Sequence, residues 1–281
     1  MVLMNKVTGL INLIRPVNSA MMGLAVIVGI WVAARNLPLN ASILGFITAF
    51  TLTAASMAIN DFYDRDVDAK NEPNRPIPSR IIAPKEALEF SAVLIIIGLS
   101  VAFMTDLTGF IVAAAFILLA LIYNTKGKEK GLLGNFMVSA CIAIPFIYGG
   151  LIVGKALYVP LLIFAVLAFF TNTGREVTKG IADLEGDKIR KVRTVAASFG
   201  SRAAAQVATI FYTIPVILSA VPLILGVVSF WYLPPVLVVD VGIIASSILL
   251  MKNYSRANAK RIKNLVLIWM LVGSIAFIVG G

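Results

Sequence analysis

The sequence predicts an all-α, polytopic membrane protein that crosses the bilayer nine times. The chain has 281 residues, of which 59% are hydrophobic, and a mean hydropathy of +0.94, well above the apolar content of ordinary soluble domains. Apolar runs long enough to cross about 30 Å of hydrocarbon recur along its length. Basic residues gather in every second connection between these runs, as the positive-inside rule requires.

Nine apolar segments are candidate spans. They cover about 10–34, 41–64, 86–105, 107–124, 132–153, 157–182, 203–228, 232–251 and 262–280. With the N-terminus inside, all but two of the 24 Lys and Arg residues fall in inner segments, the exceptions being Arg35 and Lys155. This asymmetry predicts a multi-pass protein of the cell membrane with a cytoplasmic N-terminus and an outside C-terminus. The first run contains Arg15, Pro16 and Asn18 and continues into a full span, so a cleavable signal peptide is not evident.

The absence of histidine and the presence of a single cysteine exclude several kinds of site. The chain has no histidine, which excludes histidine acid–base catalysis and zinc sites with histidine. Cys141 is the single cysteine, so it cannot form a disulfide within the chain and we expect it to pack. The net charge is +10, but the basic residues flank spans, so we expect anionic headgroups and phosphorylated substrates and no nucleic acid. No obligate protein partner is evident.

The end of the second predicted span carries the strongest chemical signal, NDFYDRDVD. On a helix Asn60, Asp64 and Asp68 share one stripe, with Asp61 beside it and Asp66 pointing away. Carboxylates crowded this closely need a counter-charge, and oxygen ligands of this kind suit a hard cation, Mg²⁺ first. The competing interpretation is a solvated, acidic helix end.

A second acidic cluster follows the sixth span, in REVTKGIADLEGDKIRKVRT. Arg175, Lys179, Asp183 and Asp187 are spaced four apart, and the two aspartates repeat the separation seen in the first cluster. Glu176 lies near the same face. Four crossings separate the two clusters, so both helices are predicted to end on the inner side.

The repeated clusters predict one membrane domain, 1–281, with an internal repeat. We expect two four-helix halves, about 1–130 and 131–255, and a ninth helix at about 262–280, around a central cavity open to the inner side and to the lipid. Facing carboxylate pairs could hold two Mg²⁺ ions, which keep waters and take up substrate phosphates. Basic residues interleaved with the acids could grip phosphate oxygens: Arg75, Lys126, Lys179, Lys188 and Arg193.

Metals and cations beside an apolar, membrane-open cavity point to an isoprenoid diphosphate as substrate. The metals would neutralise the leaving diphosphate, and the C–O bond would ionise to an allylic cation. Apolar and aromatic walls would shield that cation from water. The candidate aromatics are Phe62, Tyr63, Tyr123 and Phe169, for which core packing is the alternative role.

The motifs NDFYDRDVD, NRPIPS, YNTK and DLEGD, in this order, resemble the UbiA superfamily of intramembrane prenyltransferases. The resemblance covers nearly the whole chain. It is strongest to archaeal members that move a geranylgeranyl group from its diphosphate to the hydroxyl of geranylgeranylglyceryl phosphate, a lipid phosphate, for ether membrane lipids. Arg80 departs from the pattern, because many relatives have glycine after NRPIPS; it could add an anion contact or alter the turn.

The resemblance also implies roles for individual residues. The implied metal ligands or their close supports are Asn60, Asp64, Asp68, Asp183 and Asp187. The implied catalytic residues are Asp61, Asp64 and Asp183, with Asp61 orienting the acceptor or a metal-bound water. Tyr123 and Lys126 match a Tyr-x-x-Lys element that faces the diphosphate. Arg15 and Asn18 match a polar element that touches the acceptor, although Arg15 could instead snorkel to the headgroups.

Two other functions remain open at this point. A prenyltransferase of the same superfamily could take an aromatic acceptor, such as a hydroxybenzoate, a quinone precursor or a porphyrin. A cation-coupled transporter also has intramembrane acids and repeated halves, but here the acids cluster at one side and basic residues accompany them. Asp240 lies within the eighth span and could line the cavity or pair with a polar partner. Glu86 and Glu89 suit the start of the third span, and Asp106 suits an outer turn.

Overall fold

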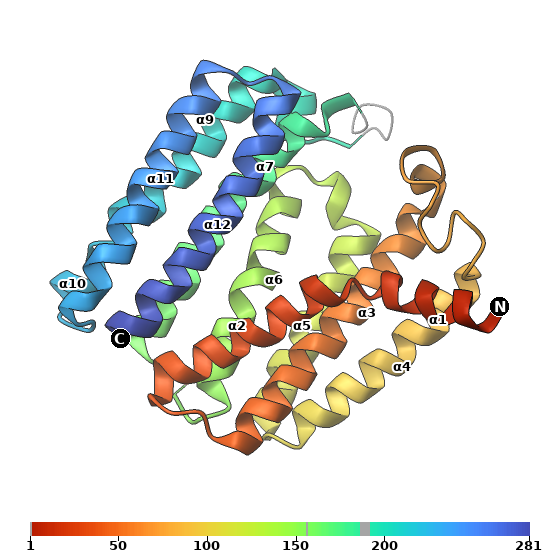
Figure 1. Ribbon diagram of the computed structural model, residues 1–281, viewed down its shortest axis with the longest axis horizontal. Coiled ribbons are helices and arrows are strands. Elements are labelled where there is room, and N and C mark those ends of the chain that lie inside the picture. The colour runs from red at the N-terminus through yellow and green to blue at the C-terminus, as the bar shows by residue number, and fades with distance from the viewer. Residues whose placement is uncertain (1, 156, 186–191) are drawn as a thin grey trace.

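The computed structural model describes residues 2–155, 157–185 and 192–281, which form a bundle of helices (Figure 1). Over these ranges the chain contains helices and turns and no β-strand. Nine helical segments of the described chain are long and apolar enough to cross a membrane. The prediction of an all-α protein with nine spans is therefore confirmed.

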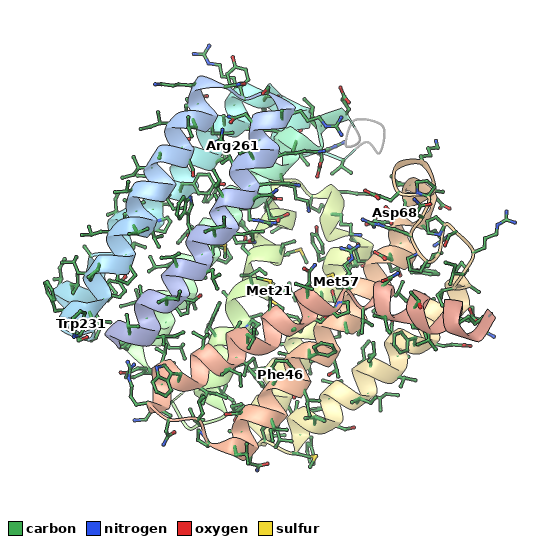
Figure 2. All side chains as sticks on the ribbon, viewed as in Figure 1. Met21, Phe46, Met57, Asp68, Trp231 and Arg261 are labelled. Atoms are coloured by element: carbon green, nitrogen blue, oxygen red, sulfur yellow. The ribbon has the colours of Figure 1, made fainter. Side chains whose placement is uncertain are left out.

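The long helices carry the nine candidate spans. They are α2 (Pro16–Ala34), α3 (Leu39–Asn71), α4 (Pro84–Phe103), α5 (Leu107–Thr125), α6 (Leu132–Leu151), α7 (Val159–Ala182), α9 (Val195–Leu218), α11 (Leu233–Lys252) and α12 (Arg256–Gly280). The short helices are α1 (Val2–Leu13), η1 (Gly127–Glu129), α10 (Val221–Ile224) and η2 (Phe230–Tyr232). Asp68 and Arg261 lie toward one end of the bundle, and Trp231 lies toward the other (Figure 2).

The first predicted span, 10–34, is wrong in that it is two helices. α1 ends at Leu13 and α2 begins at Pro16, whose fixed φ and missing N–H suit the first turn of a helix. Arg15, between them, has a left-handed backbone with φ 45° and ψ 71°. A hydropathy pattern does not register such a break, because both helices are apolar.

The helix that carries the second predicted span, 41–64, continues beyond it. α3 runs for 33 residues, so its length is about 50 Å, well beyond the thickness of the hydrocarbon core. Its last two turns therefore extend past the apolar layer as an unbroken helix. This extension places Asp64 and Asp68 on helix, where four-residue spacing keeps them on one face.

The seventh predicted span, 203–228, is displaced toward the C-terminus. α9 begins at Val195, where the Thr194 side chain accepts a hydrogen bond from the Ala197 N–H at 3.1 Å. The helix is interrupted at Gly200, which has φ 85° and ψ 165°, and ends at Leu218. The early start gives α9 an apolar first turn at the polar end of the bundle.

Polar groups at the helix starts and inside the bundle find local partners. Glu86 accepts from the Ala83 N–H at 2.8 Å, and Asp106 accepts from the Gly109 N–H at 2.7 Å. These contacts satisfy amides at the first turns of α4 and α5. Asp240 of α11 accepts from the Ser219 hydroxyl at 2.8 Å. This contact confirms the alternative in which Asp240 pairs with a polar side chain. Cys141 is a free cysteine that packs with the apolar core, as expected.

Close helix contact depends on glycine at one interface. α2 packs against α6, where a Cβ added at Gly29 would overlap the Phe146 carbonyl oxygen. A Cβ added at Gly149 would likewise overlap the Val26 carbonyl oxygen. Small residues allow this backbone-to-backbone approach, which is how helices gain contact energy in a bilayer.

Replacing Arg80 with glycine should stabilise the protein. Arg80 is exposed and has φ 61°, in the left-handed region. A Cβ there costs about 1–2 kcal/mol, partly offset by the larger backbone entropy of unfolded glycine. We expect Arg80→Gly to raise the free energy of unfolding by about 0.5–1 kcal/mol, measured by thermal denaturation in detergent. Arg80→Ala is the control, because it removes the same side chain and keeps the strain; an equal gain from it would refute the backbone explanation.

Candidate active site

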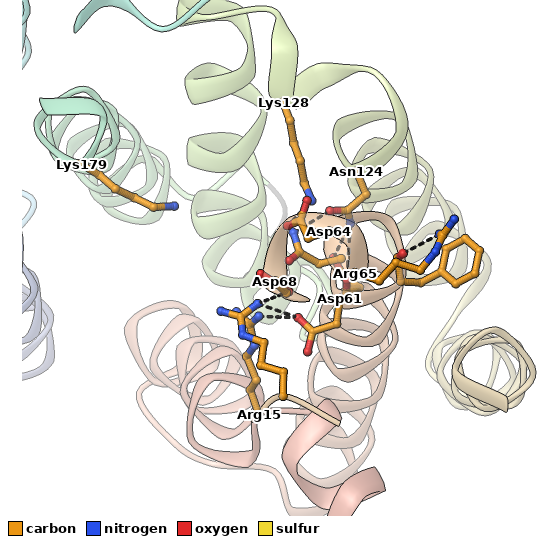
Figure 3. Close-up of polar contacts among 12 residues, drawn as sticks. Arg15, Asp61, Asp64, Arg65, Asp68, Asn124, Lys128 and Lys179 are labelled. Atoms are coloured by element: carbon orange, nitrogen blue, oxygen red, sulfur yellow. Dashed lines mark hydrogen bonds and ion pairs between the residues drawn. The ribbon is translucent and has the colours of Figure 1, made fainter. Parts of the chain in front are cut away.

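Two buried carboxylates at the end of α3 are held by arginines from other segments (Figure 3). Asp61 is 3% exposed, and it accepts from Arg15 Nη2 at 2.5 Å and from Arg75 Nη1 at 3.4 Å. The same Arg75 nitrogen donates to Asp68 Oδ2 at 2.6 Å, and Asp68 is also 3% exposed. Arg75 therefore bridges both carboxylates and ties the loop after α3 back onto that helix.

The third aspartate of the motif faces a different cation. Lys128 of η1 donates to Asp64 Oδ2 at 2.8 Å, and both side chains are about one-fifth exposed. Asn60 lies beside them, with its amide 2.9 Å from Asn124 Oδ1 on α5. When the side-chain amide of Asn60 is rotated by 180°, its nitrogen donates to Asp64 Oδ2 at 3.1 Å. In this orientation its oxygen accepts from Lys128 Nζ at 2.8 Å. Oxygens of Asn60 and Asp64 thus converge on one position occupied by a positive charge.

A second set of charges lies on α7. Glu176 is buried and accepts from Arg175 Nη1 at 2.7 Å and from Lys179 Nζ at 3.3 Å. Lys179 points from α7 toward the aspartates of α3 (Figure 3). Tyr123, at the end of α5, interacts electrostatically with Lys179 and with Asp64. The α3 and α7 clusters therefore adjoin the same end of α5.

The remaining predicted residues of the second cluster lie where α7 ends. Asp183 follows the last residue of α7, and its N–H donates to the Lys179 carbonyl at 3.0 Å. Its side chain is half-buried. Asp187 and Lys188 lie outside the described residues, so their predicted roles stay predictions.

Several other predicted residues lie away from these contacts. Lys126 and Asn18 have exposed side chains, at the end of α5 and the start of α2. Arg193 is also exposed, next to a cavity between α6 and α9. Asp66 points to solvent with 86% of its side chain exposed, 3.8 Å from Arg65, and the prediction that it faces away from the stripe is confirmed.

The candidate aromatic walls divide into different environments. The Phe62 ring lies under the Arg65 guanidinium at 4.6 Å and packs against the buried cluster around Ile77 and Ile82. Tyr63 is 46% exposed. These contacts favour packing for Phe62, whereas the electrostatic interactions of Tyr123 with Lys179 and Asp64 favour a place at the site.

Sequence reasoning missed three contributors to this site. Lys128, rather than Lys126, contacts Asp64, and only the η1 turn decides which of the two lysines faces inward. Asn124 is buried and polar inside the YNTK motif, which is a signal that could have been used. Glu176 was placed only near the stripe, yet it is the carboxylate that both Arg175 and Lys179 contact.

The oxygens of the α3 stripe have the chemistry of a divalent-cation site. Asn60 and Asp64 present oxygens to one cationic position, and Asp68 lies one helical turn further on. No group of three or more acidic or cysteine side chains that could hold a metal by itself occurs among the described residues. This set suits Mg²⁺ in its chemistry, because Mg²⁺ binds through one or two carboxylates together with water and substrate phosphates.

Comparison with known proteins identifies the family. A model described as the UbiA prenyltransferase family matches residues 22–272. The chain belongs to the UbiA prenyltransferase family. It is therefore a prenyltransferase and an integral, multi-pass membrane protein, and the transporter alternative is overturned by this match.

One relative is similar over nearly its entire length. The digeranylgeranylglyceryl phosphate synthase of Archaeoglobus fulgidus is 34% identical, with 96% of this chain and 94% of that protein covered. A solved structure described as digeranylgeranylglyceryl phosphate synthase in membranes has a TM-score of 0.84 and 30% identity, covering 98% of both chains. A UbiA homologue from Archaeoglobus fulgidus bound to GPP and Mg²⁺ has a TM-score of 0.67 at 20% identity, covering 96% of this chain and 99% of that one, and it shares the fold.

Removing Arg75 should destabilise this UbiA-family protein, because Asp61 and Asp68 would each lose a charged partner while buried. Loss of a partner from a buried pair costs about 3–5 kcal/mol. Because one-third of the Arg75 side chain is exposed, solvent screening lowers this energetic cost. We therefore expect Arg75→Ala to lower the free energy of unfolding by about 2–3 kcal/mol. Thermal unfolding in detergent measures the effect.

The matched control for this prediction is an exposed ion pair. Lys85 and Glu89 lie 3.6 Å apart with side chains 88% and 63% exposed, so Lys85→Ala should cost less than about 0.5 kcal/mol. Adding Asp68→Asn to Arg75→Ala should recover part of the loss, because it removes one unpaired charge. If Arg75→Ala lowers the free energy of unfolding no more than Lys85→Ala does, the ion pairs of Arg75 with Asp61 and Asp68 do not stabilise the protein as proposed.

Lys128 and Lys126 form a matched pair for catalysis. Lys128→Ala removes the ammonium 2.8 Å from Asp64, a charged hydrogen bond, so kcat/KM for prenyl transfer should fall about tenfold or more. Lys126→Ala should stay within about twofold, because that side chain is exposed. Steady-state kinetics of both variants measure kcat/KM. A larger loss in Lys126→Ala than in Lys128→Ala would favour Lys126 as the residue that faces the diphosphate, as the sequence predicted.

Proposed function

We propose that this prenyltransferase moves a geranylgeranyl group from geranylgeranyl diphosphate to the hydroxyl of geranylgeranylglyceryl phosphate. The observation that carries the proposal is the near-full-length similarity to a digeranylgeranylglyceryl phosphate synthase. The charge arrangement at the ends of α3, α5 and α7 supports it, because both substrates present phosphate groups. The product is digeranylgeranylglyceryl phosphate, a precursor of ether membrane lipids.

The basic side chains of the site would bind the diphosphate of the donor. Lys128, Arg75 and Lys179 already lie at carboxylates, so phosphate oxygens would compete for the same N–H donors. Exchange of one oxygen acceptor for another keeps each of these cations paired throughout. Tyr123 interacts electrostatically with Lys179 and with Asp64, and its hydroxyl can donate to a phosphate oxygen.

We assign Mg²⁺ as the cofactor. The residues that would hold it are Asn60, Asp64, Asp68, Asp183 and Asp187, the last of which lies outside the described residues. When bound, the metal supplies Lewis-acid neutralisation of the leaving diphosphate. The UbiA homologue described with GPP and Mg²⁺ supports this assignment.

The transfer itself exchanges one C–O bond for another. The bond between C1 of the prenyl chain and the diphosphate breaks, and the diphosphate leaves with the electron pair. The acceptor hydroxyl oxygen then attacks the allylic cation, and its proton passes to the diphosphate or to a nearby carboxylate. Asp61 is held by two arginines, which fixes its geometry for positioning the acceptor.

The topology follows from the charge distribution. We propose that the inner end, with the α3 and α7 clusters, faces the cytoplasm, so that the N-terminus is cytoplasmic and the C-terminus is outside. We also propose two halves, about 1–130 and 131–255, with the ninth helix at about 262–280 and a central cavity between them. The packing of α12 against both α11 and α7 supports its place beside the second half.

A transfer assay with purified protein tests the reaction. With Mg²⁺, labelled geranylgeranyl diphosphate and geranylgeranylglyceryl phosphate, we expect labelled digeranylgeranylglyceryl phosphate, and we expect Asp64→Asn to lower kcat about 100-fold or more. Asp66→Asn is the matched control, because Asp66 points to solvent, and it should stay within about twofold.

Two outcomes of this assay would overturn the proposal. Absence of transfer to geranylgeranylglyceryl phosphate would remove the assigned acceptor. Preferential transfer to 4-hydroxybenzoate in a mixture of both acceptors would assign the aromatic alternative instead.

A further inference from the structure

A cavity of about 550 Å³ lies between the start of α6 and the first half of α9. Its walls are mostly apolar, with Leu132 on α6 facing Val195, Phe199 and Val207 on α9. Phe199 is 77% exposed although it is a large aromatic side chain. The volume lies within the range of about 300–1,000 Å³ that is usual for ligand sites.

The apolar surface continues deeper into the bundle along both helices. Phe136 follows Leu132 by four residues, and Phe211 follows Val207 by four, so each pair shares a helix face. The rings of Phe136 and Phe211 meet edge to face, with centroids 5.7 Å apart. The two rings fill the space between the helices at this level, so an alkyl chain in the cavity would lie against Leu132, Phe199 and Val207.

Two cations lie at the polar end of the cavity. Lys130 and Arg193 both line it, and both side chains are exposed. The two segments are in backbone contact, because a Cβ added at Gly131 would overlap the Arg193 carbonyl oxygen. Glu129 also lines the cavity and offsets one of the two positive charges.

The cavity adjoins the candidate active site through η1. Lys128, which contacts Asp64, and Lys130, which lines the cavity, are separated by one residue. A headgroup held at Lys130 would therefore lie two residues along the chain from the lysine that contacts Asp64.

We propose that this cavity binds the acceptor, a lipid phosphate monoester with an isoprenoid chain. The chain lies along α6 and α9, and the phosphate pairs with Lys130 and Arg193. A phosphate monoester carries about 1.5–2 negative charges and three strong acceptor oxygens, so Lys130 and Arg193 can each pair with a different oxygen of one headgroup although Glu129 lies nearby. The inference rests on the proposed function, and it moves Arg193 from the diphosphate, where the sequence placed it, to the acceptor.

The test separates the two substrates kinetically. The double variant Lys130→Ala/Arg193→Ala should raise KM for geranylgeranylglyceryl phosphate about tenfold or more, with KM for geranylgeranyl diphosphate within about twofold. Ala203→Leu, which narrows the apolar part of the cavity, should raise the same KM and leave the charges intact. Lys252→Ala/Lys260→Ala is the matched control, because these inner cations are exposed and outside the cavity lining.

A direct binding measurement separates failure of the proposed acceptor site from failure of the proposed reaction. Labelled geranylgeranylglyceryl phosphate is bound to the protein in nanodiscs without donor, and the melting midpoint of each variant is recorded to confirm folding. A rise in KM for the donor, or unchanged acceptor binding in both cavity variants, overturns this inference and leaves the proposed function intact. Equal competition by a phosphodiester lipid would also overturn it. Cavity-dependent binding without any transfer would support the site and refute the proposed function.

Discussion

The need to compensate buried carboxylates governs the end of the molecule that carries the α3 and α7 clusters. Asp61 and Asp68 are almost wholly buried at the end of α3, where an unpaired charge would cost several kcal/mol. Their partners come from two other segments, Arg15 at the break between α1 and α2, and Arg75 in the loop after α3. The break, the long α3 and the returning loop are therefore parts of one arrangement.

The same arrangement suits phosphate chemistry. Each carboxylate of the α3 stripe and Glu176 of α7 has a basic partner within hydrogen-bond distance, and these pairs are partly or wholly removed from water. Charges in such positions are screened weakly by salt, so they act strongly on an incoming anion. Because the cations are already paired with carboxylates, a phosphate that enters the site takes over hydrogen bonds that the cations otherwise make to carboxylate oxygens.

Much of this site follows from sequence spacing. The four-residue spacing predicts that Asn60, Asp64 and Asp68 share a face and that Asp66 turns away, and the exposure of Asp66 confirms the second point. Hydropathy and the distribution of basic residues predict nine spans. The same signals failed at Arg15, because a left-handed residue separates two apolar helices without changing the hydropathy of either. They also failed at the start of α9, because the Thr194 cap begins the helix at Val195, eight residues before the predicted apolar run.

By itself the sequence determined the number of spans, the faces on which the acids lie and the family, since hydropathy, helical periodicity and motif order are local properties. The tertiary structure decided which cation meets which carboxylate. Arg15 reaches Asp61 across 46 residues and Lys128 reaches Asp64 across 64, and such pairs depend on how helices pack and loops turn. Periodicity gives the direction of a side chain on its own helix, but only packing brings a partner to it.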